Sequence, residues 1–123
     1  ESGVQIPSDM IHYGTTKTAQ LGVARGLAQQ TSGTNVTVNS VIPGSTRSEG
    51  AERFIADLAK EKGKTTDEIE REFFETVRPT CLIKRFATIE EVATFVTYLV
   101  SPLAAANNGA ALRVDGGTIP TIL

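Results

Sequence analysis

The sequence predicts an α/β fold that contains part of a doubly wound parallel sheet. Helical and strand patterns alternate along the chain in the order helix, strand, two-helix excursion, helix, strand. This alternation is typical of parallel sheets with helices on both faces. Two short strands cannot shield their own backbone groups, because parallel strands need neighbours and covering helices. We therefore expect only about half of such a sheet.

A long helix is expected first, over residues 10–31. Ser8 or Asp9 is placed to cap its N-terminus, and Gly33 fits the position after its end. One stripe at helical spacing contains Tyr13, Lys17, Leu21, Ala24 and Ala28. Small residues on the same helix lower its intrinsic stability, and close approach by another element would explain them. They include Gly14, Ala19, Gly22 and Gly26.

The next segment predicts a strand followed by a helix. Residues 36–42 are apolar or β-branched at most positions, as expected for a strand covered on both faces, and Pro43-Gly44 ends it. Apolar residues at helical spacing then predict an amphipathic helix over residues 50–62.

Two capping boxes predict where further helices begin. Thr65 with Glu68 opens the second helix of the excursion, and Thr88 with Glu91 opens a helix over residues 89–100. A final short strand is expected over residues 110–114, and Asp115-Gly116-Gly117 is expected to form a turn directly after it. No helix follows these glycines, so we interpret them as a turn and not as a phosphate cradle.

The amino-acid composition limits the classes of protein to which this chain can belong. The chain has 123 residues, 40% of them hydrophobic, and a net charge of −2, which suits one domain with a core. It has no basic stripe, which argues against nucleic acid and anionic membranes as partners. The single cysteine, Cys81, allows no disulfide framework or thiolate metal site, and we expect it to be a buried or half-buried thiol. Without a membrane-length apolar run, signal peptide or initiator methionine, the chain is expected to be the inside of a longer cytoplasmic protein.

The main candidate for chemistry is the pair Tyr13 and Lys17. Residues four apart lie on the same face of a helix, so their polar tips can converge. A cation near a tyrosine lowers its pKa from about 10 by ~1–3 units, which would suit Tyr13 to proton exchange. The spacing alone is a weak signal, and a half-buried tyrosine beside a solvated lysine stays open as an alternative.

Several motifs together resemble the C-terminal half of a short-chain dehydrogenase/reductase, a Rossmann-type protein. They are Tyr13-x-x-x-Lys17, Asn39-Ser40-Val41-Ile42-Pro43-Gly44, Lys84-Arg85-Phe86, Thr88-Ile89-Glu90-Glu91-Val92-Ala93 and Val114-Asp115-Gly116-Gly117. Each motif is common, but their order and spacing are specific. The resemblance spans residues 1–123 and implies the C-terminal portion of one Rossmann-type doubly wound parallel sheet.

The resemblance implies an oxidoreductase that uses NAD or NADP and acts on a small secondary alcohol or ketone. Tyr13 would be the general acid/base at the substrate oxygen. Lys17 would lower the pKa of Tyr13 and hydrogen-bond the nicotinamide ribose. The family also implies a homo-oligomer, a dimer or tetramer, and no metal. His12, beside Tyr13, is expected to pack or to line the substrate pocket.

The resemblance also implies cofactor contacts after the first strand. The Pro43-Gly44 turn follows a strand's carboxyl end, where open α/β sheets bind their ligands. The backbone near Thr46 and the hydroxyl of Ser48 match positions that meet the nicotinamide carboxamide, with serine where threonine is common. Thr46 capping the next helix remains an alternative. Residues 49–82 would form the substrate loop, mobile until ligand binds.

The other residues that the family uses for cofactor binding and catalysis lie before the tyrosine in the sequence. The Gly-rich phosphate turn, the catalytic asparagine and the catalytic serine all precede it, and the serine usually lies thirteen positions earlier, just ahead of Glu1. Ser2 is two positions too late for that role. We therefore expect residues 1–123 alone to be inactive and to lack a full NAD(P) site.

Two other functions stay open. One is a non-catalytic interaction module, because the helix that begins near Thr88 and the strand that begins at Ala110 resemble the family's assembly surfaces. The other is a free-standing α/β binding domain in which all the motifs arise by chance.

Overall fold

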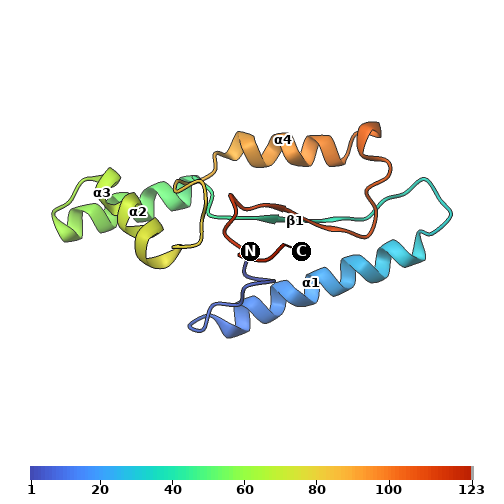
Figure 1. The fold of residues 1–123 in the computed structure, drawn as a ribbon, viewed down its shortest axis with the longest axis horizontal. Coiled ribbons are helices and arrows are strands. Elements are labelled where there is room, and N and C mark those ends of the chain that lie inside the picture. Colours follow the sequence, from blue (N-terminus) through green and yellow to red (C-terminus); the bar gives the residue numbers. More distant parts are fainter. Residues whose placement is uncertain (123) are drawn as a thin grey trace.

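A two-stranded parallel sheet lies between helices in the computed structural model, which describes residues 1–122 (Figure 1). Strand β1 (Ser40–Pro43) pairs with β2 (Ala111–Val114), with Ser40 opposite Ala111. The long helix α1 (Ile11–Gln30) and the helix α4 (Ile89–Leu99) lie on opposite sides of this sheet. The other elements are α2 (Glu49–Lys62), α3 (Thr66–Glu72), the π-helix η1 (Phe73–Val77) and the 3₁₀ turn η2 (Pro102–Ala104). The predicted α/β order is confirmed.

Both strands are shorter than the sequence predicts, and the first begins at residue 40 instead of 36. Before that point, asparagine side chains take over part of the pairing between the two segments. The Val38 N–H donates to Asn108 Oδ1 at 2.9 Å, and the Asn39 side chain donates to the Asn107 carbonyl at 2.7 Å. Asparagine amides compete with regular backbone pairing in this way, so the strand pattern extends further than the strand.

Helix α1 has almost the predicted length, but the predicted caps Ser8 and Asp9 are wrong. The N-cap is Met10, whose side chain makes no cap bond, and its N–H donates to the Pro7 carbonyl at 3.1 Å. Tertiary packing fixes this end instead, because Gly14 is buried and an added Cβ would lie 2.5 Å from Ile6 Cγ2. Close approach thus explains Gly14.

Among residues 1–122, no close approach accounts for Gly22 or Gly26. Nothing in the described part of the chain lies within 4 Å of a Cβ added at Gly22 or Gly26. Val23 and Leu27, on the same stretch, expose 63% and 47% of their surface. This side of α1 therefore faces away from the described residues, and close approach at these positions stays a prediction.

The main hydrophobic core lies in the two-helix excursion, residues 49–82, together with Phe86 just after it, and not between the helices and the sheet. It is formed by Ile55, Ala59, Ile69, Phe74, Cys81 and Phe86. Cys81 exposes 2% of its surface, as expected for a buried thiol. Both predicted capping boxes are present, with Thr65 and Thr88 as N-caps. The segment that resembles a substrate loop therefore has helices and a core of its own.

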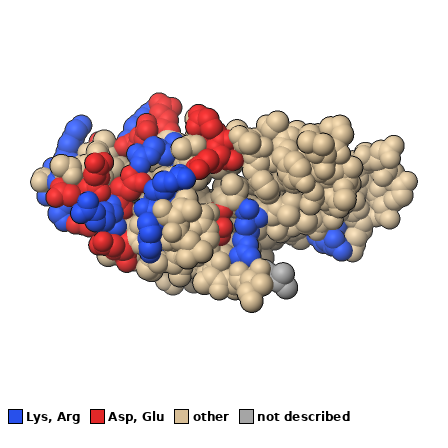
Figure 2. All heavy atoms as spheres, turned by 45° about the horizontal axis from the view of Figure 1, so that its top comes forward, with Lys and Arg blue, Asp and Glu red and all other residues tan. Residues whose placement is uncertain are grey.

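Charged side chains gather over this excursion. Figure 2 shows blue and red groups covering one end of that face, while the other end is almost free of them. Between residues 86 and 112 the only acidic or basic residues are Glu90 and Glu91. Within residues 1–122, no helix combines the length and the apolarity that a membrane crossing requires.

The capping box of α4 makes a testable contribution to stability that depends on pH. Arg85 donates to Glu91 at 2.7 and 2.9 Å, and the Thr88 N–H donates to it at 2.8 Å. These bonds lower the pKa of the Glu91 carboxyl from 4.5 to about 2. Because the folded-state pKa is the lower one, the stabilisation is present above pH 4.5 and is lost as the pH falls toward 2.

We therefore expect Glu91→Gln to lower the melting temperature at pH 7, and the difference from the wild type to shrink between pH 4.5 and pH 2. Thermal unfolding followed by circular dichroism across that range measures both effects. Glu90→Gln is the matched control, because Glu90 neighbours Glu91 but forms no ion pair in the described structure. A difference that persists unchanged at pH 2 would contradict the assignment.

Candidate active site

A cavity of about 320 Å³ opens at the carboxyl end of β1, against the first turns of α1. Tyr13 and Lys17 line it from the helix, and Pro43 and Gly44 line it from the strand end. The structure therefore brings together these sequence-predicted residues from separate parts of the chain. His12 is exposed among the described residues and does not line this cavity, so the expectation that it packs is not met, and its place in a substrate pocket stays a prediction.

Tyr13 and Lys17 lie beside each other in this cavity. The Lys17 ammonium lies over the Tyr13 ring, 5.3 Å from the ring centroid, at a distance where a cation attracts the aromatic face. Within residues 1–122 the Tyr13 hydroxyl and the Lys17 ammonium have no hydrogen-bond partner. Tyr13 is 43% exposed. Both polar tips are therefore available to a ligand.

The ends of the two strands touch at Gly44. A Cβ added there would lie 2.6 Å from the Asp115 carbonyl oxygen and 2.8 Å from its Cα. Asp115 is buried, and its carboxylate accepts from the Gly117 and Ile119 N–H groups at 3.1 and 2.9 Å. Gly116 and Gly117 have φ angles of 62° and 74°, which favour glycine. The predicted turn is confirmed, and it supports the floor of the cavity.

Gly44→Ala is expected to destabilise the chain by about 1–3 kcal/mol, since the new methyl group would meet backbone atoms that cannot move aside easily. Chemical denaturation measures the loss. The matched control is Gly22→Ala, where the space is open and the helix should gain about 0.5–1 kcal/mol. Equal effects of the two substitutions would contradict the steric role of Gly44.

Thr46 and Ser48 lie outside this cavity. The Thr46 hydroxyl donates to the Gly44 carbonyl at 3.0 Å, and its main chain forms a bridge with Ala87. Ser48 is the N-cap of α2 and accepts from the Ala51 N–H at 3.3 Å. The alternative that Thr46 caps the helix is therefore wrong, because Ser48 does so. The cofactor contacts of both residues remain predictions.

Two residues that the sequence analysis missed stand beside the site. Glu1 lines the cavity, and its carboxylate accepts a hydrogen bond from Arg78. No local pattern predicts this pair, since 77 positions separate its members.

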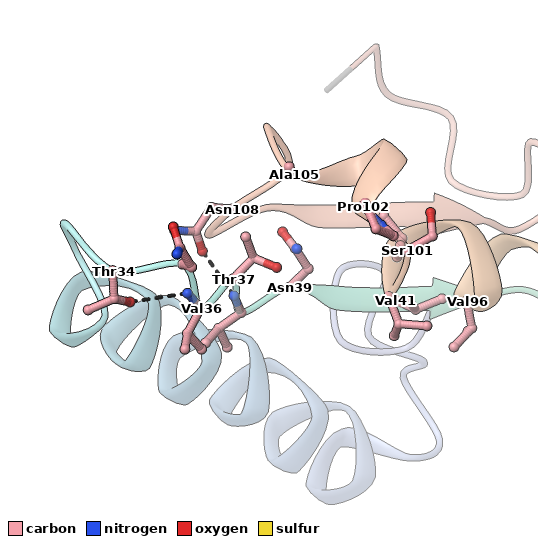
Figure 3. A pocket seen from close by; sticks show the side chains of 14 residues that line it. Thr34, Val36, Thr37, Asn39, Val41, Val96, Ser101, Pro102, Ala105 and Asn108 are labelled. Carbon is pink, nitrogen blue, oxygen red and sulfur yellow. Dashed lines mark hydrogen bonds between the residues drawn. The ribbon is translucent and has the colours of Figure 1, made fainter.

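A larger hollow of about 900 Å³ lies between residues 34–39 and the end of α4 (Figure 3). Asn108 closes part of its wall by accepting from the Val38 N–H, and Thr34 accepts from the Val36 N–H at 3.1 Å. None of its lining residues carries a titratable side chain. Acid–base chemistry therefore points to the smaller cavity. Nor do residues 1–122 contain a cluster of three or more potential metal ligands.

Comparison with known proteins identifies the family. Residues 2–118 match the family model described as enoyl-(acyl carrier protein) reductase. The chain belongs to the short-chain dehydrogenase/reductase family. The resemblance expected from the motifs is thereby confirmed.

Two relatives come from Bacillus subtilis (strain 168). The chain is 47% identical over 122 residues to the uncharacterized oxidoreductase YvaG and 46% identical to the uncharacterized oxidoreductase YvrD. Each comparison covers 99% of this chain and 46% of the relative. The chain therefore spans about half the length of these family members.

A solved structure shows the same fold. L-sorbose reductase from Gluconobacter frateurii, complexed with NADPH and L-sorbose, superposes with a TM-score of 0.88 at 29% identity. The match covers 98% of this chain and 45% of the reductase. The Rossmann-type sheet of the family is therefore the fold of this chain.

Proposed function

We propose that residues 1–123 are the C-terminal portion of one Rossmann-type domain in an NAD(P)-dependent oxidoreductase acting on a secondary alcohol or ketone. The observation that carries this proposal is the shared cavity, in which the free polar tips of Tyr13 and Lys17 lie next to the Pro43-Gly44 turn. Family membership supports it, and so does the NADPH bound by the related L-sorbose reductase.

Tyr13 is the proton carrier in this proposal. Its hydroxyl donates a proton to the carbonyl oxygen during reduction and takes a proton from the alcohol during oxidation. Lys17 holds its ammonium 5.3 Å from the centroid of the Tyr13 ring and so places a positive charge beside the proposed proton carrier. The nicotinamide, when bound, supplies the hydride chemistry.

The residues around the cavity fit such a cofactor in part. Lys17 has free donors for a ribose hydroxyl, and the Pro43-Gly44 turn lies at the strand end where this fold binds its ligands. Thr46 and Ser48 continue that turn, and we propose contacts with the carboxamide for them. The Ser48 hydroxyl would make such a contact while it caps α2.

The rest of the cofactor site would come from the half of the family fold that this chain lacks. Three observations support this view. In the described structure β1 pairs on one edge only, the sheet end of the molecule carries few charges in Figure 2, and the large hollow of Figure 3 has a neutral lining. Surfaces of this kind suit burial against further strands and helices.

Nucleotide titration by calorimetry tests the proposal. We expect micromolar binding of NAD(H) or NADP(H) by the full-length protein and none by residues 1–123. Micromolar binding by the 123-residue chain would overturn the claim that its site is incomplete. Absence of binding by the full-length protein would overturn the oxidoreductase proposal itself.

An assembly role is the second candidate function. Val100 and Leu103, just after α4, expose 80% and 83% of their surface. Exposed aliphatic groups of this size suit a subunit interface, and a cytoplasmic homo-oligomer is part of the proposal. Native mass spectrometry of residues 1–123 mixed with the full-length protein would detect mixed oligomers, and their absence would count against this role.

A further inference from the structure

One ion pair joins distant parts of the chain. The Nε group of Arg78 donates to Glu1 Oε1 across 77 positions. Every other ion pair among residues 1–122 joins side chains no more than 23 positions apart. The pair is also well shielded, since the side chains of Arg78 and Glu1 expose 22% and 9% of their surface.

Arg78 is fixed to the end of the excursion. Its N–H donates to the Phe73 carbonyl at 2.9 Å and closes the π-helical turn η1. Its guanidinium lies 5.9 Å from the Phe73 ring centroid and donates to the Val77 carbonyl at 3.0 Å. The charge of Arg78 therefore follows the position of η1.

Glu1 is fixed to the cavity. Its main-chain nitrogen donates to the Pro43 carbonyl at 2.8 Å, and its own carbonyl accepts from the Val4 N–H at 2.9 Å. It lines the cavity together with Tyr13 and Lys17. The pair Glu1–Arg78 thus links the excursion to the wall of the proposed active site.

We propose that Arg78 is a positioning residue that latches the end of the excursion onto the Tyr13 cavity through Glu1. The latch holds the substrate-binding segment at one distance from the acid/base, and in this respect the inference rests on the proposed function. The other carboxylate oxygen of Glu1, Oε2, is buried without a hydrogen-bond partner. Glu1 depends on Arg78 for its compensation, because a buried charge without a partner is strongly destabilising.

Hydrogen exchange on the full-length protein without cofactor tests the latch. We expect Arg78→Met to accelerate amide exchange in residues 66–82 about tenfold, because breaking one partner of a shielded pair loosens both sides. Arg53→Met is the matched control. Arg53 pairs with Glu49 on the exposed surface of α2, where such pairs contribute little. Unchanged exchange in Arg78→Met would overturn the latch.

The double variant shows whether the two residues act as a pair. Glu1→Gln should also accelerate exchange, and Glu1→Gln with Arg78→Met should exchange no faster than the faster single variant. Multiplied effects would mean that the two residues act separately and would overturn the inference.

Steady-state kinetics tests positioning apart from stability. In the full-length enzyme, Arg78→Met should raise the KM for the alcohol or ketone about tenfold and leave the Kd of the nucleotide unchanged. Faster exchange with an unchanged KM would overturn the positioning role. If the full-length protein shows no oxidoreductase activity, the proposed function fails, while the exchange experiment still decides the latch.

Discussion

Tyr13→Phe in the full-length protein is expected to lower kcat by about 10²–10⁴-fold, the usual contribution of a positioned general acid or base. The substitution removes one oxygen atom and keeps the ring over which the Lys17 ammonium lies. Nucleotide affinity and the melting temperature should change little, because the hydroxyl makes no hydrogen bond within the described residues. Steady-state assays with NADH or NADPH and a panel of small ketones measure the loss.

Tyr98→Phe is the matched control for this experiment. Tyr98 is exposed to nearly the same extent, 42% against 43%, and its hydroxyl lies 3.4 Å from Asn107 Oδ1, outside the Tyr13 cavity. We expect it to retain wild-type kcat. A Tyr13→Phe enzyme as active as the Tyr98→Phe enzyme would remove Tyr13 from the mechanism.

Phe74→Ala is expected to lower the free energy of unfolding by about 3–5 kcal/mol, as for other large side chains removed from a core. Phe74 exposes 2% of its surface. Its ring centroid lies 5.0 Å from that of Phe73 and 5.0 Å from that of Phe86, in edge-on arrangements that aromatic rings favour. A loss of this size is a large part of the 5–15 kcal/mol that typically stabilises a domain.

Urea denaturation followed by circular dichroism measures that loss. Phe54→Ala serves as the control, since Phe54 lies on the neighbouring helix α2 but is 60% exposed. It should cost less than half as much. If both variants unfold at the same urea concentration, the aromatic cluster is not the core of the excursion.

Local signals predicted the helices well and the ends of the strands poorly. The capping boxes at Thr65 and Thr88 each involve two residues three positions apart, so a short stretch of sequence is enough to predict them. The start of α1 depends on Ile6 packing against Gly14, which no capping pattern encodes. The early end of the ladder depends on Asn108, which lies 70 positions from its partner Val38.

At the candidate site, too, the sequence predicts local features better than long-range contacts. Tyr13 and Lys17 lie one helical turn apart, and the Pro43-Gly44 turn ends a recognisable strand, so their meeting follows from the fold class. Ser48 shows the limit of this reasoning, because its hydroxyl caps α2 whether or not it also meets a cofactor. The contact between Glu1 and Arg78 could not be predicted from the sequence, because 77 positions separate the two residues.

The aromatic core inside the excursion has an evolutionary consequence. Because Phe73, Phe74 and Phe86 pack on one another, mutations on the outer surface of α2 and α3 are expected to leave helix α1 undisturbed. If the excursion binds substrate as proposed, it could diversify toward new substrates while the proposed acid/base pair, Tyr13 and Lys17, stays constant. In the proposed enzyme, selection would then act on two units joined by the Glu1–Arg78 pair, one for substrate recognition and one for proton transfer.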